Sequence, residues 1–328
     1  MRRREFIAGV GGIAAAWPFA ARAQQTAKRV IGFLAGGPDA PNRGPNDPRS
    51  GASFYQGLKE AGYVVGHNVA IEYRAGPANV NRLTELAREL VQQQVAVIIT
   101  MTDGAALGAK RATSNIPIVF YGIGSDPVKL GLVDSINQPG GNITGAAFDG
   151  PGLAAKEFDV LCQLVPTAMT VAYLVRGRTL LSFEEQKNSL AATAGALGRQ
   201  LIVVECPRDD ELGHAFATIV ERGARAAIVG PLFGPTVVPF ATQYKVPAAY
   251  FGRDFAIRGG LMSYRRDFAD EIRIATGLVG QILDGAMPAN LPVRRSSRFN
   301  FVINLKTAKE LDLDVPQHLL ALADEVIE

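Results

Sequence analysis

The chain has 328 residues, of which 48% are hydrophobic and 20% are charged. This composition is typical of a globular protein with a large buried core, and it excludes a disordered chain, a collagen-like fibre and a small disulfide scaffold. Two cysteines are too few for a Cys-rich zinc site, and the three histidines lie far apart without ligand spacing. At roughly 100 to 200 residues per domain, the length favours two lobes.

The first 23 residues have the pattern of an export signal. Arg2, Arg3 and Arg4 precede an apolar run, and the small residues before position 24 suit a leader peptidase. The adjacent arginines favour a twin-arginine signal, and an ordinary Sec leader is the alternative. The run is too short to span a bilayer comfortably, and no cysteine follows it. We therefore expect an exported, soluble, periplasmic protein without a transmembrane helix or a lipid anchor.

The net charge of the chain belongs to this leader. The leader carries four arginines and one glutamate, a net charge of +3, which equals the net charge of the whole chain. The remaining chain is near neutral, so the basic isoelectric point gives no support for nucleic-acid binding. Cys162 falls in a helical pattern and Cys206 follows a strand-like run. We expect two buried free thiols, with a disulfide in the oxidising compartment as the alternative.

After the leader, strand-like and helical patterns alternate. Short apolar runs rich in β-branched residues occupy 29–34, 69–74, 95–101 and 117–121. Between them, residues 79–93 place their apolar side chains on one helical face. This alternation predicts parallel strands joined by crossover helices. The run at 95–99 is apolar at every position, which predicts a strand covered on both faces.

The series then restarts, which predicts a second, similar α/β lobe. New strand-like runs occupy 170–175, 201–205, 225–230 and 247–251. Further on, the chain has a strand-like run at 260–264, a long helix from Phe268 to Ile282 and a last strand at 299–303. We expect the first lobe to comprise 27–146 plus 254–290, and the second 147–253 plus 291–328. Repeated crossing between lobes would make a hinge of several strands that permits opening and closing.

Ligands of open parallel sheets bind outside the carboxyl ends of the strands, where helix N-termini can hold anions. Polar, glycine-containing loops follow three of the predicted strands of the first lobe. We expect their hydroxyl and N–H groups to converge on a carboxylate-sized anion, although Ser, Thr and Asp at these places also fit helix N-caps without a ligand role. The first-lobe candidates are Ala35, Gly36, Thr100, Thr102, Asp103, Tyr121, Ser125 and Asp126.

The strand ends of the second lobe supply the opposite wall. We expect Tyr121, Phe233 and Phe251 to stack on or enclose the apolar body of a ligand. Asp254 could pair with a ligand ammonium, and an Arg253–Asp254 pair without a ligand role is the alternative. The second-lobe candidates are Arg176, Gly230, Phe233, Phe251, Arg253 and Asp254.

Signals of catalysis are poor. The chain has no G-x-S-x-G elbow, no G-x-x-x-x-G-K-[ST] loop and no H-E-x-x-H pair. The basic cluster Arg294, Arg295 and Arg298 is interpreted as a solvated connector, with a docking patch as the alternative. We predict no catalytic residue, no metal site and no cofactor.

Five segments occur in an order that points to a family. They are 57–63 (GLKEAGY), 111–120 (RATSNIPIVF), 139–145 (PGGNITG), 260–264 (GLMSY) and 303–309 (INLKTAK). Together they resemble the ABC-transporter substrate-binding proteins of the tryptophan-binding, TrpX-like family, over nearly all of the chain after the leader. The resemblance implies a type I periplasmic-binding fold, with two Rossmann-like lobes, a three-stranded hinge and a ligand cleft between the lobes. It also implies an amino acid or related acid as ligand, and a membrane permease with its ATPase as partner.

By this resemblance, Thr102 and Ser125 match positions that hold a ligand carboxylate, with Asp126 nearby, and Asp254 lies near a crossover that often supplies an amine partner. The chain departs from the family at Arg265, where a glycine is usual, and at 176–178, where Asn-Pro is often found. Arginines at 176 and 178 would favour a ligand with an extra acidic group.

We expect a monomer that binds a small carboxylate-bearing ligand and no nucleic acid. Two alternatives are kept: a ligand-sensing module for a membrane receptor, and an exported α/β enzyme. Neighbouring permease and ATPase genes would favour the transport function over the sensing module.

Overall fold

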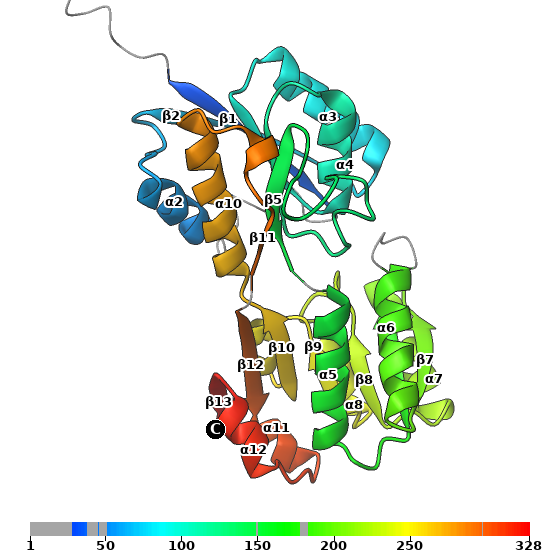
Figure 1. Cartoon of the computed structure of the whole chain (residues 1–328). Coiled ribbons are helices and arrows are strands. Elements are labelled where there is room, and N and C mark those ends of the chain that lie inside the picture. Colours follow the sequence, from blue (N-terminus) through cyan, green and yellow to red (C-terminus); the bar gives the residue numbers. More distant parts are fainter. Residues whose placement is uncertain (1–27, 38–44, 46–50, 149, 178–182, 297) are drawn as a thin grey trace, which may run out of the picture.

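The computed structural model describes residues 28–37, 45, 51–148, 150–177, 183–296 and 298–328. The expected leader and Arg178 lie outside these residues. Two α/β lobes are stacked one above the other (Figure 1). Within the described ranges, no helix has the length and apolar character needed to cross a membrane.

The upper lobe in Figure 1 contains a six-stranded sheet in the order β11-β5-β4-β3-β1-β2. All its strand pairs are parallel, as the alternation of strand and helix patterns predicts. The strands are β1 (Arg29–Gly36), β2 (Val69–Gly76), β3 (Val97–Met101), β4 (Ile118–Tyr121), β5 (Ile143–Ala147) and β11 (Arg294–Arg295). The helices are α2 (Gly51–Glu60), α3 (Val80–Gln92), α4 (Asp103–Ala112), α10 (Phe268–Leu283) and the short 3-10 helix η4 (Pro288–Asn290).

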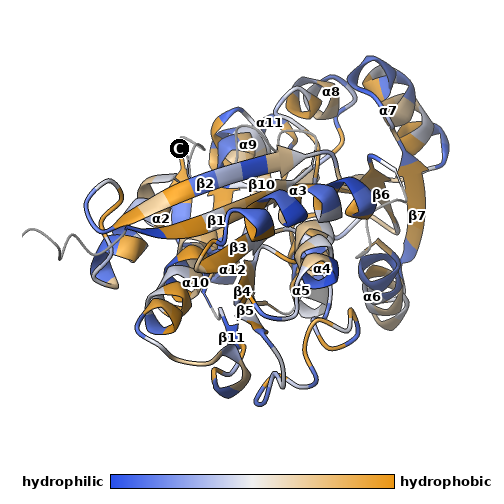
Figure 2. Cartoon of the chain, turned by 90° about the horizontal axis from the view of Figure 1, so that it is seen from above, coloured by the Kyte–Doolittle hydropathy of each residue, from blue (hydrophilic) through white to orange (hydrophobic). Residues whose placement is uncertain are grey.

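Helices cover both faces of this sheet. Phe33 of β1 packs in one cluster with residues of α2 and α10, whereas its neighbour Leu34 packs in a second cluster with residues of α3 and α4. The predicted apolar stripe of α3 is buried, and Asn79 caps this helix by accepting the backbone N–H groups of Asn81 and Arg82. Hydrophilic and hydrophobic residues alternate along α3, while β1 is largely hydrophobic (Figure 2).

The lower lobe contains a seven-stranded sheet in the order β13-β12-β10-β9-β8-β6-β7. Its strand pairs are parallel except for the antiparallel pair of β10 and β12. The strands are β6 (Thr170–Val175), β7 (Gln200–Glu205), β8 (Ala226–Val229), β9 (Ala248–Tyr250), β10 (Met262–Arg266), β12 (Phe299–Asn304) and β13 (Glu325–Ile327). The helices are α5 (Gly150–Leu164), α6 (Phe183–Ala196), η3 (Asp209–Glu211), α7 (Leu212–Glu221), α8 (Val237–Gln243), α9 (Arg253–Ile257), α11 (Leu305–Glu310) and α12 (Gln317–Leu322).

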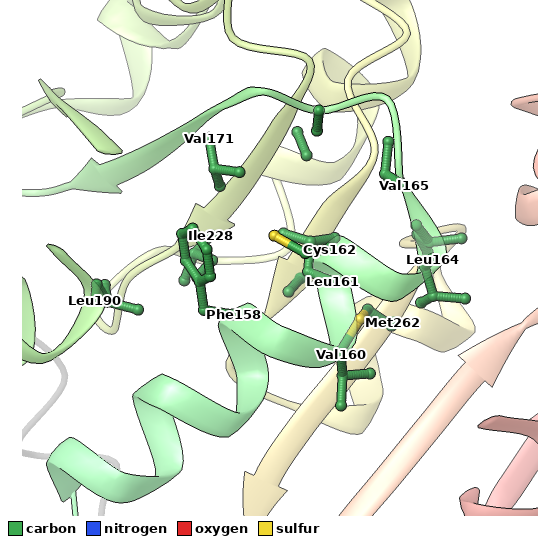
Figure 3. Packing of buried hydrophobic residues seen from close by; sticks show 14 of the residues in the cluster. Phe158, Val160, Leu161, Cys162, Leu164, Val165, Val171, Leu190, Ile228 and Met262 are labelled. Carbon is green, nitrogen blue, oxygen red and sulfur yellow. The ribbon is translucent and has the colours of Figure 1, made fainter. Parts of the chain in front are cut away.

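This second sheet also has an apolar cluster on each face. Figure 3 shows Phe158 and Cys162 of α5 packed with Ile228 of β8 and Met262 of β10. Cys206 belongs to the cluster on the other face, with residues of α7 and α8. Both cysteines are buried and free, so the expectation of two free thiols is confirmed.

The chain crosses between the lobes three times. It leaves the first sheet after β5, returns at Asp267 between β10 and α10, and leaves again between β11 and β12. The backbone N–H of Asp267 donates to the carbonyl of Arg298 at 2.8 Å, which joins the second and third crossings. The expected lobe boundaries were wrong on two counts. Residues 254–266 belong to the second lobe, because β10 pairs with β9 and β12, and 291–295 belong to the first, because β11 pairs with β5.

Candidate functional site

The strand order places a topological switch point in each lobe. In the first sheet β1 lies between β2 and β3, and in the second sheet β6 lies between β7 and β8. Loops on the two sides of such a strand run in opposite directions, which opens a crevice at its carboxyl end. Gly36 and Thr102 flank the first switch point, and Arg176 and Gly230 flank the second. Four of the sequence-predicted candidates, two from each lobe, therefore lie at these two crevices.

Gly36 and Thr102 are in close contact at the first crevice. A Cβ atom on Gly36 would lie 2.8 Å from Thr102 Oγ1, so a larger residue would displace the threonine. Thr102 has φ = 95°, a strained conformation for a β-branched residue. Its Oγ1 accepts the backbone N–H of Ala105 at 3.4 Å, which caps α4. A strained backbone conformation persists only where the surrounding structure enforces it. Such conformations concentrate at ligand-binding and active sites.

Asp103, the first residue of α4, holds the loop that follows β4. Its carboxylate accepts the N–H of Gly124 and the hydroxyl of Ser125, each at 2.8 Å. Asp126 accepts the N–H groups of Val128 and Lys129 and so caps the next turn. Because Ser125 gives its hydroxyl proton to Asp103, its oxygen can only accept a further hydrogen bond. This arrangement suits a ligand ammonium, whereas the resemblance implied a ligand carboxylate at Ser125.

The second-lobe crevice is lined by a paired arginine. Arg176 forms an ion pair with Asp209, and its guanidinium lies 4.6 Å from the ring centre of Phe233. Gly230, directly after β8, is tightly packed, because a Cβ there would lie 3.0 Å from the Leu174 carbonyl oxygen. Asp209 neutralises Arg176, so this residue gives no support for a ligand with an extra acidic group.

A cavity of about 180 Å³ lies between the lobes. The Lys129 ammonium of the first lobe pairs with Glu185 of α6 at 3.3 Å and bridges the two walls. Phe148, directly after β5, adds an aromatic surface, and Arg295 reaches the cavity from β11. The lining residues are Asp126, Pro127, Lys129, Ala147, Phe148, Glu185 and Arg295. The cavity thus has two acidic and two basic side chains contributed by both lobes.

Two further hollows belong to the second lobe and the hinge. One of about 140 Å³ lies between α8 and α11, and an open groove of about 600 Å³ lies beside Tyr264 and Phe299. Although this groove is larger, its lining residues belong to the second lobe except for two hinge residues, Asp267 and Arg298. A solute there would gain little from closure, so the interlobe cavity is the better candidate.

Comparison with known families agrees with this geometry. A family model described as ABC transporter substrate binding protein matches residues 47–327. The chain belongs to this family. The substrate-binding protein has the type I periplasmic-binding fold that the resemblance implied, with two mostly parallel α/β lobes.

Relatives of the substrate-binding protein are known from several bacteria. It is 23% identical to a tyrosine-binding protein of Clostridioides difficile over 82% of this chain and 78% of that protein. A Streptococcus pneumoniae ABC domain in complex with L-Trp is 25% identical, with a TM-score of 0.77 over 92% of this chain and 100% of that one. A conserved domain protein of Vibrio cholerae superposes with a TM-score of 0.79 at 22% identity, over 92% and 100% of the two chains.

Three predicted candidates of the substrate-binding protein lie inside the first-lobe core. Ala35, Thr100 and Tyr121 are fully buried. The Tyr121 hydroxyl donates to the sulfur of Met101 at 3.7 Å, and its ring packs against Phe33. Their side chains face the helices that cover the sheet, which contradicts the expectation that Tyr121 encloses a ligand.

The candidates on and before α9 have other partners. Arg253 forms a two-point ion pair with Glu325 of β13, and both side chains are exposed or half-buried. The pair lowers the pKa of the Glu325 carboxyl. Asp254 is exposed in the first turn of α9, a helix that packs on β9, β10 and β12. Arg253 therefore fastens α9 to the C-terminal strand, and its guanidinium is engaged by Glu325. The Phe251 ring lies 4.5 Å from the Arg265 guanidinium, which covers it.

Two buried charges near the cavity were missed by the sequence analysis. Arg266, at the end of β10, and Glu271, on α10, lie 3.1 Å apart, and Glu271 is fully buried. Burial raises the pKa of the Glu271 carboxyl, and the nearby Arg266 opposes this shift. The arginine pair at 265–266 is visible in the sequence, but its partner cannot be assigned without the path of the hinge. Among the described residues, no group of three or more His, Cys, Asp or Glu side chains could hold a metal ion.

Proposed function

We propose that this substrate-binding protein is the periplasmic solute-binding component of an ABC importer and that its ligand is a small amino acid or a related zwitterion. The carrying observation is the interlobe cavity, because the first lobe contributes acidic and basic side chains to it and the second lobe contributes Glu185. We infer that the protein has no chemistry of its own and delivers the solute unchanged to a permease with its ATPase. The export pattern of residues 1–23 supports the location.

The size of the cavity supports a small solute. Its volume is about 180 Å³, below the ~300 to 1,000 Å³ typical of sites for drug-sized ligands. A single amino acid is of the right order, whereas a peptide or an oligosaccharide is too large. The relatives support the same class, since one is described as tyrosine-binding and another is a complex with L-Trp.

The charges of the cavity support a zwitterion. Glu185 uses one oxygen to bind Lys129, while its Oε2 is buried and has no hydrogen-bond partner among the described residues. A buried acceptor of this kind normally receives a donor, and a ligand ammonium would supply one. The Arg295 side chain has no ion-pair partner in the described ranges and would receive the ligand carboxylate. Asp126 and the Ser125 lone pairs lie on the same loop and would complete the ammonium site.

Binding at this place would close the lobes. The ligand would contact Asp126 and Phe148 from the first lobe and Glu185 from the second. These contacts are complete only when the lobes are together, so the ligand has a higher affinity for the closed state. The closed population then rises in proportion to this difference in affinity.

The test is calorimetric titration of the protein with the twenty common amino acids, after unfolding and refolding to remove co-purified ligand. We expect saturable binding of one or a few of them. Replacing Arg295 by serine should weaken that binding about tenfold to a hundredfold, the usual effect of losing a charge-assisted hydrogen bond.

Arg294 provides the matched control. It precedes Arg295 on the same exposed strand but does not line the cavity. Arg294→Ser should bind as the unchanged protein does. Equal losses in the two variants would indicate a general effect of surface charge, and no binding by any amino acid would overturn the proposed ligand class.

A further inference from the structure

Three charged side chains from three different elements hold the backbone of the loop after β4. Glu271 of α10 accepts the N–H of Gly122 at 3.1 Å. Arg266 of β10 donates from Nη1 to the carbonyl of Ile123 at 3.1 Å. Asp103 of α4 accepts the N–H of Gly124 at 2.8 Å. The polar backbone groups of three consecutive residues are therefore each held by an acidic or a basic side chain.

Arg266 differs from the other two, because it comes from the opposite lobe. Its strand, β10, belongs to the seven-stranded sheet and pairs with β9 and β12. The Ile123 carbonyl and Glu271 both belong to the first lobe, so the side chain extends across the hinge. It is 6% exposed, and its guanidinium lies 3.7 Å from the ring centre of Phe148 and 5.3 Å from that of Phe268.

The same side chain supports the interlobe cavity from behind. Phe148 lines the cavity on one side and carries the Arg266 guanidinium on its ring. Asp126, another lining residue, follows the loop that Arg266 and Glu271 hold. The guanidinium therefore positions both an aromatic wall and an acidic wall of the cavity.

Stability alone does not account for such a pair. Removing two charges from water is costly, and a buried ion pair replaced by apolar residues of similar volume often leaves a protein as stable as before or more so. The Arg266–Glu271 pair does have a role if it fixes the orientation of the loop after β4.

We propose that Arg266 is a positioning residue through which the second lobe orders the first-lobe binding loop, Gly122 to Asp126, and the Phe148 wall. The proposal rests on the proposed function for its effect on affinity, but the ordering of the loop is independent of any ligand. Opening of the hinge would withdraw the guanidinium from the Ile123 carbonyl and loosen the loop. Closure would restore it, so the binding surface is complete only when the lobes are together.

The test compares two double variants. Arg266→Met/Glu271→Leu removes both buried charges and retains side chains of similar length. The control, Arg74→Met/Glu89→Leu, removes a 2.7 Å ion pair between β2 and α3, away from the cavity lining. Each protein is analysed for amide hydrogen exchange without ligand, for its melting temperature, and for the dissociation constant of the amino acid that binds the unchanged protein.

We expect Arg266→Met/Glu271→Leu to melt at or above the temperature of the unchanged protein, while Gly122 to Asp126 exchange at least tenfold faster and ligand binding weakens at least tenfold. The control should change neither loop exchange nor affinity. Arg266→Lys retains the positive charge and a hydrogen-bond donor. Its loop should therefore exchange faster than in the unchanged protein and more slowly than in Arg266→Met/Glu271→Leu. If the double variant does not fold, this single variant replaces it in the exchange measurement.

Unchanged exchange at Gly122 to Asp126 in Arg266→Met/Glu271→Leu would overturn the proposal. If no amino acid binds the unchanged protein, the proposed ligand class fails, and the exchange measurement still decides whether Arg266 orders the loop. Faster loop exchange with an unchanged dissociation constant would overturn the coupling to binding.

Discussion

Glu157 provides a quantitative test of how the second lobe is built. It lies on α5 with 9% of its surface exposed, and no residue in the described ranges gives it a hydrogen bond or an ion pair. Burial raises the pKa of this carboxyl from 4.5 to about 8. Burial and, to a smaller degree, the Glu157 carboxyl raise the pKa of Tyr173. The side chain is therefore neutral in the folded protein at pH 7 and ionised in the unfolded chain.

This difference makes stability depend on pH. Below pH 4.5 the folded and unfolded states both hold the proton, so Glu157 has no effect on the free energy of unfolding. Between pH 4.5 and about 8 the unfolded state releases the proton first, and stability falls as pH rises. Each pKa unit corresponds to 1.36 kcal/mol, so the complete fall is about 5 kcal/mol. That figure is a ceiling, because a local opening that hydrates the carboxylate costs less.

Glu157→Gln removes the titration while retaining the shape of the side chain. We expect the variant to gain stability relative to the unchanged protein as pH rises, from about zero at pH 4 to several kcal/mol at pH 8.5. Urea unfolding at half-unit pH steps measures this difference. Glu221→Gln is the control, because Glu221 is exposed at the end of α7. A difference that does not vary with pH, or an equal rise in Glu221→Gln, would refute the reasoning.

Thr102→Gly should raise the free energy of unfolding by about 1 kcal/mol, because it relieves the backbone strain at φ = 95°. It should also weaken ligand binding. A lower free energy of unfolding in urea would show that Thr102 does not store this strain. Lys129→Met removes the exposed ion pair with Glu185, so small-angle scattering should give a larger radius of gyration. The free energy of unfolding should change by about 1 kcal/mol or less. An unchanged radius of gyration would contradict a role of this ion pair in holding the lobes together. Burial raises the pKa of Cys162 to about 11 and also raises the pKa of Cys206, so neither thiol should react with a disulfide reagent at pH 8 before unfolding. Rapid labelling of the folded protein would oppose this account.

The sequence was sufficient for the α/β architecture and insufficient for the lobe boundaries. Apolar runs such as 95–99 indicate strands covered on both faces, and the structure confirms this for β3. Periodicity describes one segment at a time, whereas lobe membership depends on long-range strand pairing. The run at 260–264 joined the second sheet because β10 pairs with β9 and β12, and no local pattern distinguishes this from pairing in the first sheet.

The candidate site was predicted in outline, and individual side chains were not. Loops at strand ends were identified correctly because parallel strands bring their carboxyl ends to one edge. Tyr121 was misplaced because the face of a strand's last residue depends on register, and its partner Met101 places it over the core. The partner of Arg253 was not predicted, because Glu325 lies 72 residues further along the chain. Glu185 was missed because its contact with Lys129 crosses between the lobes.

The most direct test of the central claim is a crystal structure of the protein grown with the amino acid that gives the strongest calorimetric signal. The account predicts density for one molecule between the lobes, with its carboxylate on Arg295 and its ammonium near Glu185 and Asp126. A ligand bound elsewhere, such as the groove beside Tyr264 and Phe299, with nothing between the lobes, would contradict it.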